Sequence, residues 1–223
     1  MIFQNRAKAL KDTAGYTIDQ TILIVAIIAI LVTLIIITVG WQLINRTSGT
    51  KLASQFKQIE DANGQFYASF RVWPDEAYSA PAVSADANMQ ALAGVAGTWN
   101  AAVPAAKIRN FVPGFRLVGT TLEHNFSSGG TVGMERVTST NMVSWFGLQG
   151  EHFVVMFADV PFSEVQEAED AIDSGGDDTL RDYASGRVVA STANCLTAVA
   201  SGVTASTSPG SLVNVCYAAN LTQ

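Results

Sequence analysis

The sequence predicts an α+β fold in which a long N-terminal α-helix packs on an antiparallel β-sheet. Three observations support it. An apolar run from Thr21 to Val39 contains only Ile, Leu, Val, Ala and Thr, and this is about the length that crosses a bilayer core as a helix. A helical amphipathic pattern continues to residue 73, and alternating polar and apolar runs follow in the second half of the chain.

The apolar run is expected to cross a membrane. No charged residue lies between Asp19 and Arg46, so the segment contains no side chain with a large free-energy cost of insertion into lipid. Three basic residues precede the run: Arg6, Lys8 and Lys11. Basic residues hold the adjoining end of a membrane helix in the cytoplasm, which sends the chain after Thr50 outward. The run is too long for an ordinary signal-peptide core, and no small-residue cleavage site follows it.

The stretch GYTIDQ, Gly15 to Gln20, resembles the processing site of type IV prepilins and type II secretion pseudopilins. In that family a membrane peptidase cuts after the glycine and the new N-terminus is methylated. The resemblance therefore implies cleavage after Gly15 and N-methylation of Tyr16. It also implies the lollipop plan of pilins, in which the first half of the helix packs with other copies and the second half lies across its own head domain.

The chain departs from the family at the fifth residue after the cut. The family usually has a glutamate there, which meets the terminal amine of a neighbouring subunit. Here the position is Gln20, and the carboxylate is one residue earlier, at Asp19. Gln20 accepts a hydrogen bond but cannot neutralise a charge. Both residues are candidates for assembly, while the alternative for Asp19 is an interfacial residue near the helix end.

The expected organisation is a leader (1–15), a long helix (16–73, of which 16–40 is the membrane or filament-core part) and one globular head (74–223). Removal of the leader leaves 10 basic and 18 acidic side chains, a net charge of −8. An acidic surface argues against nucleic acid as a main partner, because nucleic-acid affinity depends on phosphate neutralisation.

An apolar stripe marks the second half of the helix. Its positions are Leu52, Phe56, Ile59, Asn63, Phe66 and Phe70, of which only Asn63 is polar. The helix is expected to end before Pro74. Between Thr38 and Thr50, two glycines and several Thr and Ser residues are poor helix formers, so a weakened or partly unwound stretch is predicted there.

The head is predicted to contain about four antiparallel strands. Residues 78–106 form a connecting loop with one short helix. Strand patterns occupy residues 114–126 and 131–139, and two more runs lie on either side of Gly147 to Gly150.

A helix follows Pro161, with Ser163 and Gln166 as a capping box, and ends near Ser174. Val165, Ala168 and Ile172 mark one face of this helix. Short strands and turns complete the C-terminus, at residues 186–191, 195–202 and 211–218.

The two cysteines, Cys195 and Cys216, are expected to form a disulfide, since both lie in the exported part and an oxidising compartment favours pairing. Many type IV pilins carry one C-terminal disulfide at a similar spacing. Such a bridge contributes about 3 kcal/mol in the chain-entropy picture. A zinc site is disfavoured because no histidines lie between the thiols.

No catalytic motif occurs, so we expect no enzyme and no cofactor. His124 and His152 are expected to be surface or cross-strand residues. An acidic cluster follows the late helix: Glu169, Asp170, Asp173, Asp177, Asp178 and Asp182. Its spacing does not match an EF-hand. We therefore expect a solvated helix end and no metal site, with calcium binding as the alternative.

The expected function is that of a structural subunit of a type IV pilus-like filament. The resemblance implies three kinds of partner: further copies of the chain in a helical homopolymer, the prepilin peptidase with its assembly machinery, and the inner membrane before assembly. It implies a final location on the cell surface or in a periplasmic pseudopilus. The alternatives are a minor pilin or pseudopilin and, in another class, a signal-anchored extracytoplasmic binding protein or enzyme.

Overall fold

The computed structural model describes residues 18–79, 85–173, 182–196 and 207–220, with side chains at 20–36 and, except at Ala85, from 51 onward within these ranges. The helices, in chain order, are α1 (Ile18–Phe70), η1 (Pro74–Glu76), α2 (Ala85–Ala93), η2 (Ala105–Lys107), α3 (Ser139–Phe146) and α4 (Phe162–Ile172). The strands are β1 (Arg116–Val118), β2 (Thr121–Glu123), β3 (Thr131–Val137), β4 (His152–Pro161), β5 (Val188–Ser191) and β6 (Leu212–Asn220).

The chain divides into two units, Met1–Ile44 and Asn45–Gln223. In the first unit the described part is helical. The second unit is an α+β domain made of the second half of α1 and the head, with a six-stranded antiparallel sheet in the order β1-β2-β3-β4-β6-β5. The α+β class is therefore confirmed, and the strand number exceeds the four expected.

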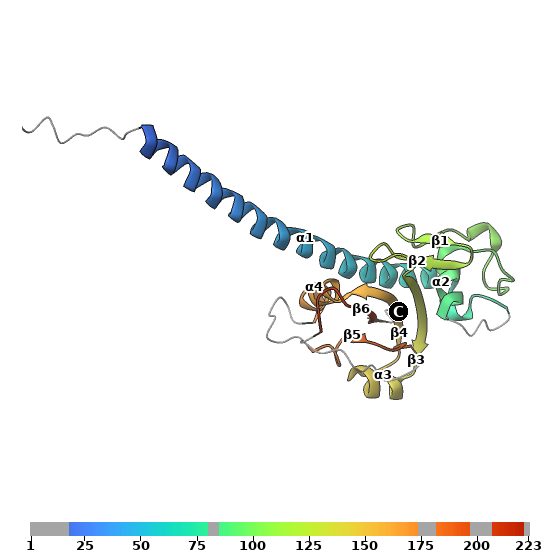
Figure 1. Ribbon diagram of the computed structural model, residues 1–223. Coiled ribbons are helices and arrows are strands. Elements are labelled where there is room, and N and C mark those ends of the chain that lie inside the picture. Colours follow the sequence, from blue (N-terminus) through green and yellow to red (C-terminus); the bar gives the residue numbers. More distant parts are fainter. Residues whose placement is uncertain (1–17, 80–84, 174–181, 197–206, 221–223) are drawn as a thin grey trace, which may run out of the picture. The chain divides into compact units, whose positions relative to one another are not determined.

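The register of the sheet explains how its two faces are covered. On β4, Phe153, Val155 and Phe157 enter the main core, in which Val155 lies opposite Met134 of β3 and Tyr217 of β6. Since successive strand residues point to opposite faces, Val154 enters a second, smaller core. Figure 1 shows the second half of α1 on one side of this sheet and α3 on the other.

The predicted stripe of α1 fills the main core. All six of its positions, Leu52, Phe56, Ile59, Asn63, Phe66 and Phe70, are buried. Phe56 packs edge-on against Phe157 and stacks on Tyr217, with ring centroids 5.0 and 4.8 Å apart. The helix ends at Phe70, and Arg71 takes a positive φ of 60° before the chain turns to Pro74. The sequence therefore located this packing face and its end closely.

The predicted weakening between Thr38 and Thr50 is wrong, since the backbone is helical through these residues. Glycine and threonine cost a helix interior at most about 1 kcal/mol each. Propagation from strong helix formers on both sides offsets such a cost.

The apolar run before Gly147 was predicted to be a strand, and this prediction is wrong because the run forms part of α3. Met142 and Phe146 are four residues apart and both fully buried, which is a helical spacing. Gly147 ends the helix at φ 70°, and its N–H bonds the carbonyls of Met142 and Val143. Five residues were too few to separate a strand from a helix by periodicity.

The other element predictions are mostly confirmed. The 114–126 pattern forms the β1–β2 hairpin, the 131–139 pattern contains β3, and residues 78–106 contain α2. The helix after Pro161 is α4, but Pro161 is its N-cap, so Ser163 lies inside the helix and the capping box is wrong. Strands β5 and β6 occupy two of the C-terminal segments, and most of 195–202 lies outside the described residues.

Candidate functional site

The predicted processing residues, Gly15 and Tyr16, lie outside the described residues. Asp19 lies in the first turn of α1, where only the backbone is described, and Gln20 is exposed. The contact of Asp19 or Gln20 with the terminal amine of a neighbouring subunit stays a prediction.

The N-terminal part of α1 presents apolar side chains around its whole circumference. Every residue from Gln20 to Ile36 is exposed. Twelve large apolar side chains in this segment are between 44% and 65% exposed: Ile22, Leu23, Ile24, Val25, Ile27, Ile28, Ile30, Leu31, Val32, Leu34, Ile35 and Ile36. The hydroxyl of Thr33 donates to the Ala29 carbonyl at 2.7 Å, so it needs no outside partner. A helix that is apolar on all sides is stable only inside a larger apolar environment.

The length and apolar character of the described helices bear on the expected membrane crossing. Among the helices of the described residues, none is found that is both long and apolar enough to cross a membrane. The membrane crossing expected for residues 16–40 stays a prediction.

A buried polar network joins the second half of α1 to the last strand. The Tyr217 hydroxyl donates to Glu60 Oε2 at 2.5 Å, and Arg187 Nη2 donates to the same oxygen at 3.0 Å. The Asn220 N–H reaches Glu60 Oε1 at 3.3 Å. The Arg187 guanidinium also hydrogen-bonds the Tyr217 hydroxyl and lies 4.8 Å from the centre of its ring. Both oxygens of one helix carboxylate are thus held by the β5–β6 edge of the sheet.

The network shifts the pKa values of its members. Burial alone would raise the pKa of Glu60, but the Tyr217 hydrogen bond and the Arg187 charge outweigh it and lower that pKa. Burial and the neighbouring Glu60 carboxylate raise the pKa of Tyr217. The stable form therefore has an ionised Glu60 and a neutral Tyr217. Nothing in the sequence paired these residues, because 157 positions separate Glu60 from Tyr217.

The predicted disulfide between Cys195 and Cys216 is present, with Cα atoms 6.3 Å apart. Both cysteines are buried in the second core, where Met142 and Phe146 of α3 pack with them. The bridge ties the segment after β5 to the middle of β6, on the face away from α1.

The two histidines differ from each other. His152 is half-buried on β4, as expected for a cross-strand residue, but His124 is only 4% exposed and the surface expectation is wrong for it. Its Nε2 lies 2.6 Å from the Ala158 carbonyl, and its Nδ1 accepts from the Phe126 N–H at 3.2 Å. These partners fix the neutral Nε2–H form, and burial lowers the pKa of His124.

The acidic cluster serves local structure where it is described. A Glu169 oxygen accepts from the Asp182 N–H at 3.3 Å, and an Asp173 oxygen accepts from the Val188 N–H at 2.7 Å. Burial raises the pKa of Asp173. Asp177 and Asp178 lie outside the described residues, and in the described ranges no group of three or more His, Cys, Asp or Glu side chains is placed to hold a metal ion.

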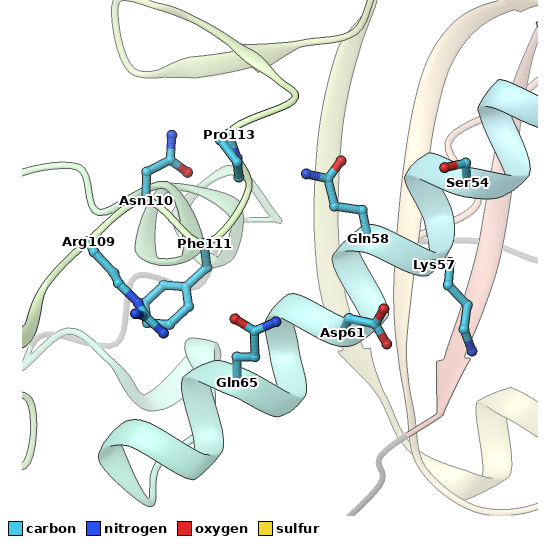
Figure 2. Close-up of a pocket in the computed structure, with 9 residues that line it drawn as sticks. All are labelled: Ser54, Lys57, Gln58, Asp61, Gln65, Arg109, Asn110, Phe111 and Pro113. Carbon is cyan, nitrogen blue, oxygen red and sulfur yellow. The ribbon is translucent and has the colours of Figure 1, made fainter.

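An open groove of about 730 Å³ runs beside the solvent-exposed side of α1 (Figure 2). One wall comes from α1, including Ser54, Gln58 and Gln65, and the other from the segment Arg109–Pro113. Phe111 forms the apolar base of the second wall, and the Arg109 guanidinium lies 4.8 Å from the centre of its ring. Sequence analysis missed this groove, because the segment 109–113 carries no recognised motif.

Comparison with known proteins finds no matching family model, no similar curated protein and no similar solved structure.

Proposed function

We propose that this chain is a structural subunit of a type IV pilus-like filament, made as a precursor and polymerised through its N-terminal helix. The observation that carries the proposal is the segment Gln20–Ile36, in which every side chain is exposed and twelve large apolar ones surround the helix. Because apolar burial contributes about 25 cal/mol per Å², the segment is strongly stabilised when lipid or neighbouring helices cover it.

The resemblance of GYTIDQ to a prepilin site supplies the second support. A precursor held in lipid and a helical bundle at a fibre centre both cover the same apolar surface, so cleavage after Gly15 allows transfer from one to the other. In this proposal the lollipop plan holds, with α1 as the stem and residues 74–223 as the head.

A minor pilin or pseudopilin is the second candidate, favoured by Gln20 where the family has glutamate. A subunit at a fibre tip has no neighbour whose amine it has to neutralise. This candidate predicts the same processing but a low abundance in the fibre. The signal-anchored binding protein or enzyme predicts neither processing nor fibre.

A cleavage-site variant tests the proposal. Gly15→Leu is expected to keep the protein in the membrane fraction and to abolish its appearance in material sheared from the cell surface. Ala14→Ser, one residue earlier, is the matched control and should be released as the wild type is. Equal release of the Gly15→Leu variant contradicts processing at this position.

A further inference from the structure

The turn between β2 and β3, residues 125–130, closes over the buried ring of His124. The backbone N–H of His124 donates to the Gly130 carbonyl at 3.1 Å, so the two ends of the turn are hydrogen-bonded to each other. The ring stacks on Phe157 of β4, with centroids 5.4 Å apart, and Phe126 of the turn packs against it at 5.5 Å. Because the His124 side chain is buried, the turn has to move before solvent reaches the ring.

The closed turn depends on a glycine at position 130. Gly130 is buried, and a Cβ atom added there would overlap the His124 ring and lie 2.5 Å from the Ser127 hydroxyl oxygen. That oxygen is buried without a hydrogen-bond partner. An unsatisfied buried hydroxyl costs free energy, which is recovered when water reaches it. The turn is therefore closely packed on the ring, and its own hydroxyl favours the open form.

The two ring nitrogens of His124 have opposite roles. Nε2 donates to the Ala158 carbonyl at 2.6 Å, at the place where the register between β4 and β6 shifts. Nδ1 accepts from the backbone N–H of Phe126 at 3.2 Å. A protonated imidazole carries a hydrogen on both nitrogens. The Nδ1–H and the Phe126 N–H would then point at each other, so this hydrogen bond cannot survive protonation.

Two carboxylates act on the ring from the strands around it, Glu123 of β2 and Asp159 of β4. Their negative charges favour the imidazolium, but burial disfavours it more strongly, so the pKa of His124 is lowered. Arg116 of β1 forms an ion pair with Glu123 at 2.5 Å, which weakens the attraction between Glu123 and the ring. The closed turn therefore excludes the charged form of His124.

We propose that residues 125–130 form an acid-opened latch: a proton from solvent binds Nδ1 of His124, the hydrogen bond from the Phe126 N–H is lost, and the turn opens while the sheet stays folded. Opening exposes the imidazole ring, the Phe126 side chain and the Ser127 hydroxyl to water. The latch goes beyond the filament proposal and does not depend on it, because it concerns only the head.

The size of the effect follows from proton linkage. In the open turn the imidazole is in water and has its ordinary pKa of 6.5. The ratio of open to closed turns therefore rises about tenfold for each pH unit below this value, until the pKa of the closed form is reached. Between about pH 7.5 and about pH 5.5 the expected increase is about tenfold.

Native-state hydrogen exchange of the full chain in mild detergent tests the latch. Protection factors are compared, since they divide out the effect of pH on the intrinsic exchange rate. The amides of His124 and Phe126 should lose about tenfold in protection from about pH 7.5 to about pH 5.5, with little dependence on low concentrations of urea. Val155, which pairs with both β3 and β6, should be far better protected and urea-dependent, because its exchange requires large-scale unfolding.

Two outcomes of this measurement overturn the latch. Equal protection and equal urea dependence at Phe126 and Val155 would show that the turn opens only when the head unfolds. Protection at Phe126 that is unchanged between the two pH values would show that protonation does not open the turn.

The two histidines of the chain supply a matched pair of variants. His124→Gln keeps an amide that can donate to the Ala158 carbonyl but removes the titration, so the protection of Phe126 should be the same at both pH values. His152→Gln should retain the tenfold loss of the wild type. A tenfold loss that persists in His124→Gln would refute the role of this ring.

A third variant opens the turn without acid. Gly130→Ala places a methyl group where the ring lies, so the Phe126 amide should already be poorly protected at about pH 7.5. Ser128→Ala, at an exposed position of the same turn, should behave as the wild type does. The protection of Val155 verifies in each variant that the head is folded. Wild-type protection of Phe126 in Gly130→Ala would contradict the closed contact on which the latch depends.

Discussion

Tyr217 of β6 donates its hydroxyl hydrogen to Glu60 of α1 at 2.5 Å, which joins the long helix to the C-terminal strand across 157 positions of sequence. Arg187, the residue before β5, completes the network. In the filament that we propose, the first half of α1 packs with other copies, and this network would be one of the contacts that join the head to that helix.

Removing the carboxylate should destabilise the head strongly. Glu60→Ala leaves Arg187 and Tyr217 without their common partner, and breaking a buried ion pair in this way costs about 3 kcal/mol. The free energy of unfolding of the full chain in mild detergent, followed by tryptophan fluorescence in denaturant, measures the loss. Asp61→Ala, at the neighbouring exposed position, is the control and should change it by less than about 0.5 kcal/mol. Equal effects of the two variants would contradict the role given to the network.

Replacing Asn63 by an apolar residue should increase the stability of the protein. It is 2% exposed within the apolar stripe of α1, its Nδ2 contacts only the sulfur of Met134 at 3.3 Å, and its Oδ1 has no hydrogen-bond partner. Asn63→Leu removes an unsatisfied buried acceptor, and we expect the free energy of unfolding to rise by about 1 kcal/mol. Asn88→Leu is the contrasting variant, because Asn88 donates to the Met134 carbonyl at 2.9 Å, and it should lower the stability. A loss on Asn63→Leu equal to that on Asn88→Leu would show that the Asn63 amide is needed.

His124 should make the head less stable in mild acid. Its pKa is lowered in the folded state from 6.5, so the unfolded chain binds more protons below about pH 6.5. The free energy of unfolding therefore falls as the pH drops through this value and continues to fall until the folded-state pKa is reached. His124→Gln keeps an amide that can donate to the Ala158 carbonyl but removes the titration. Chemical denaturation at about pH 7.5 and about pH 5.5 should show a smaller decrease for this variant, and the same decrease in both proteins would refute the assignment.

The disulfide should stabilise the second core. Replacing both Cys195 and Cys216 by alanine removes the cross-link with its 21-residue separation, and we expect a loss of about 3 kcal/mol. The denaturant midpoint of the double variant should match that of reduced wild-type protein. If the double variant keeps the wild-type midpoint, the bridge contributes nothing to the fold.

The sequence predicted what local periodicity controls. The stripe from Leu52 to Phe70 follows helical spacing over several turns, and the strand pattern is strong in β4 and weaker in β3, so these elements were correctly placed. The segment 142–146 was misassigned because five residues are too few to distinguish a helical turn from a short strand by their periodicity. The burial of His124 was missed because it depends on contacts with Phe157 and Ala158 of β4, and Ala158 lies 34 positions further along the chain.

The candidate sites also differ in whether the sequence alone could predict them. The disulfide was predictable because only two cysteines occur in the chain. The Glu60 network and the groove beside α1 were not, since each is assembled by tertiary contacts between segments far apart in the sequence.

The most direct test of the filament proposal is intact-mass and N-terminal peptide mass spectrometry on protein sheared from the cell surface. The proposal predicts an N-terminal peptide that begins at Tyr16 and carries one added methyl group, and an abundant sheared fraction would favour a major subunit. A protein with Met1 at its N-terminus, found only in the membrane fraction, would contradict the filament and favour the signal-anchored alternative.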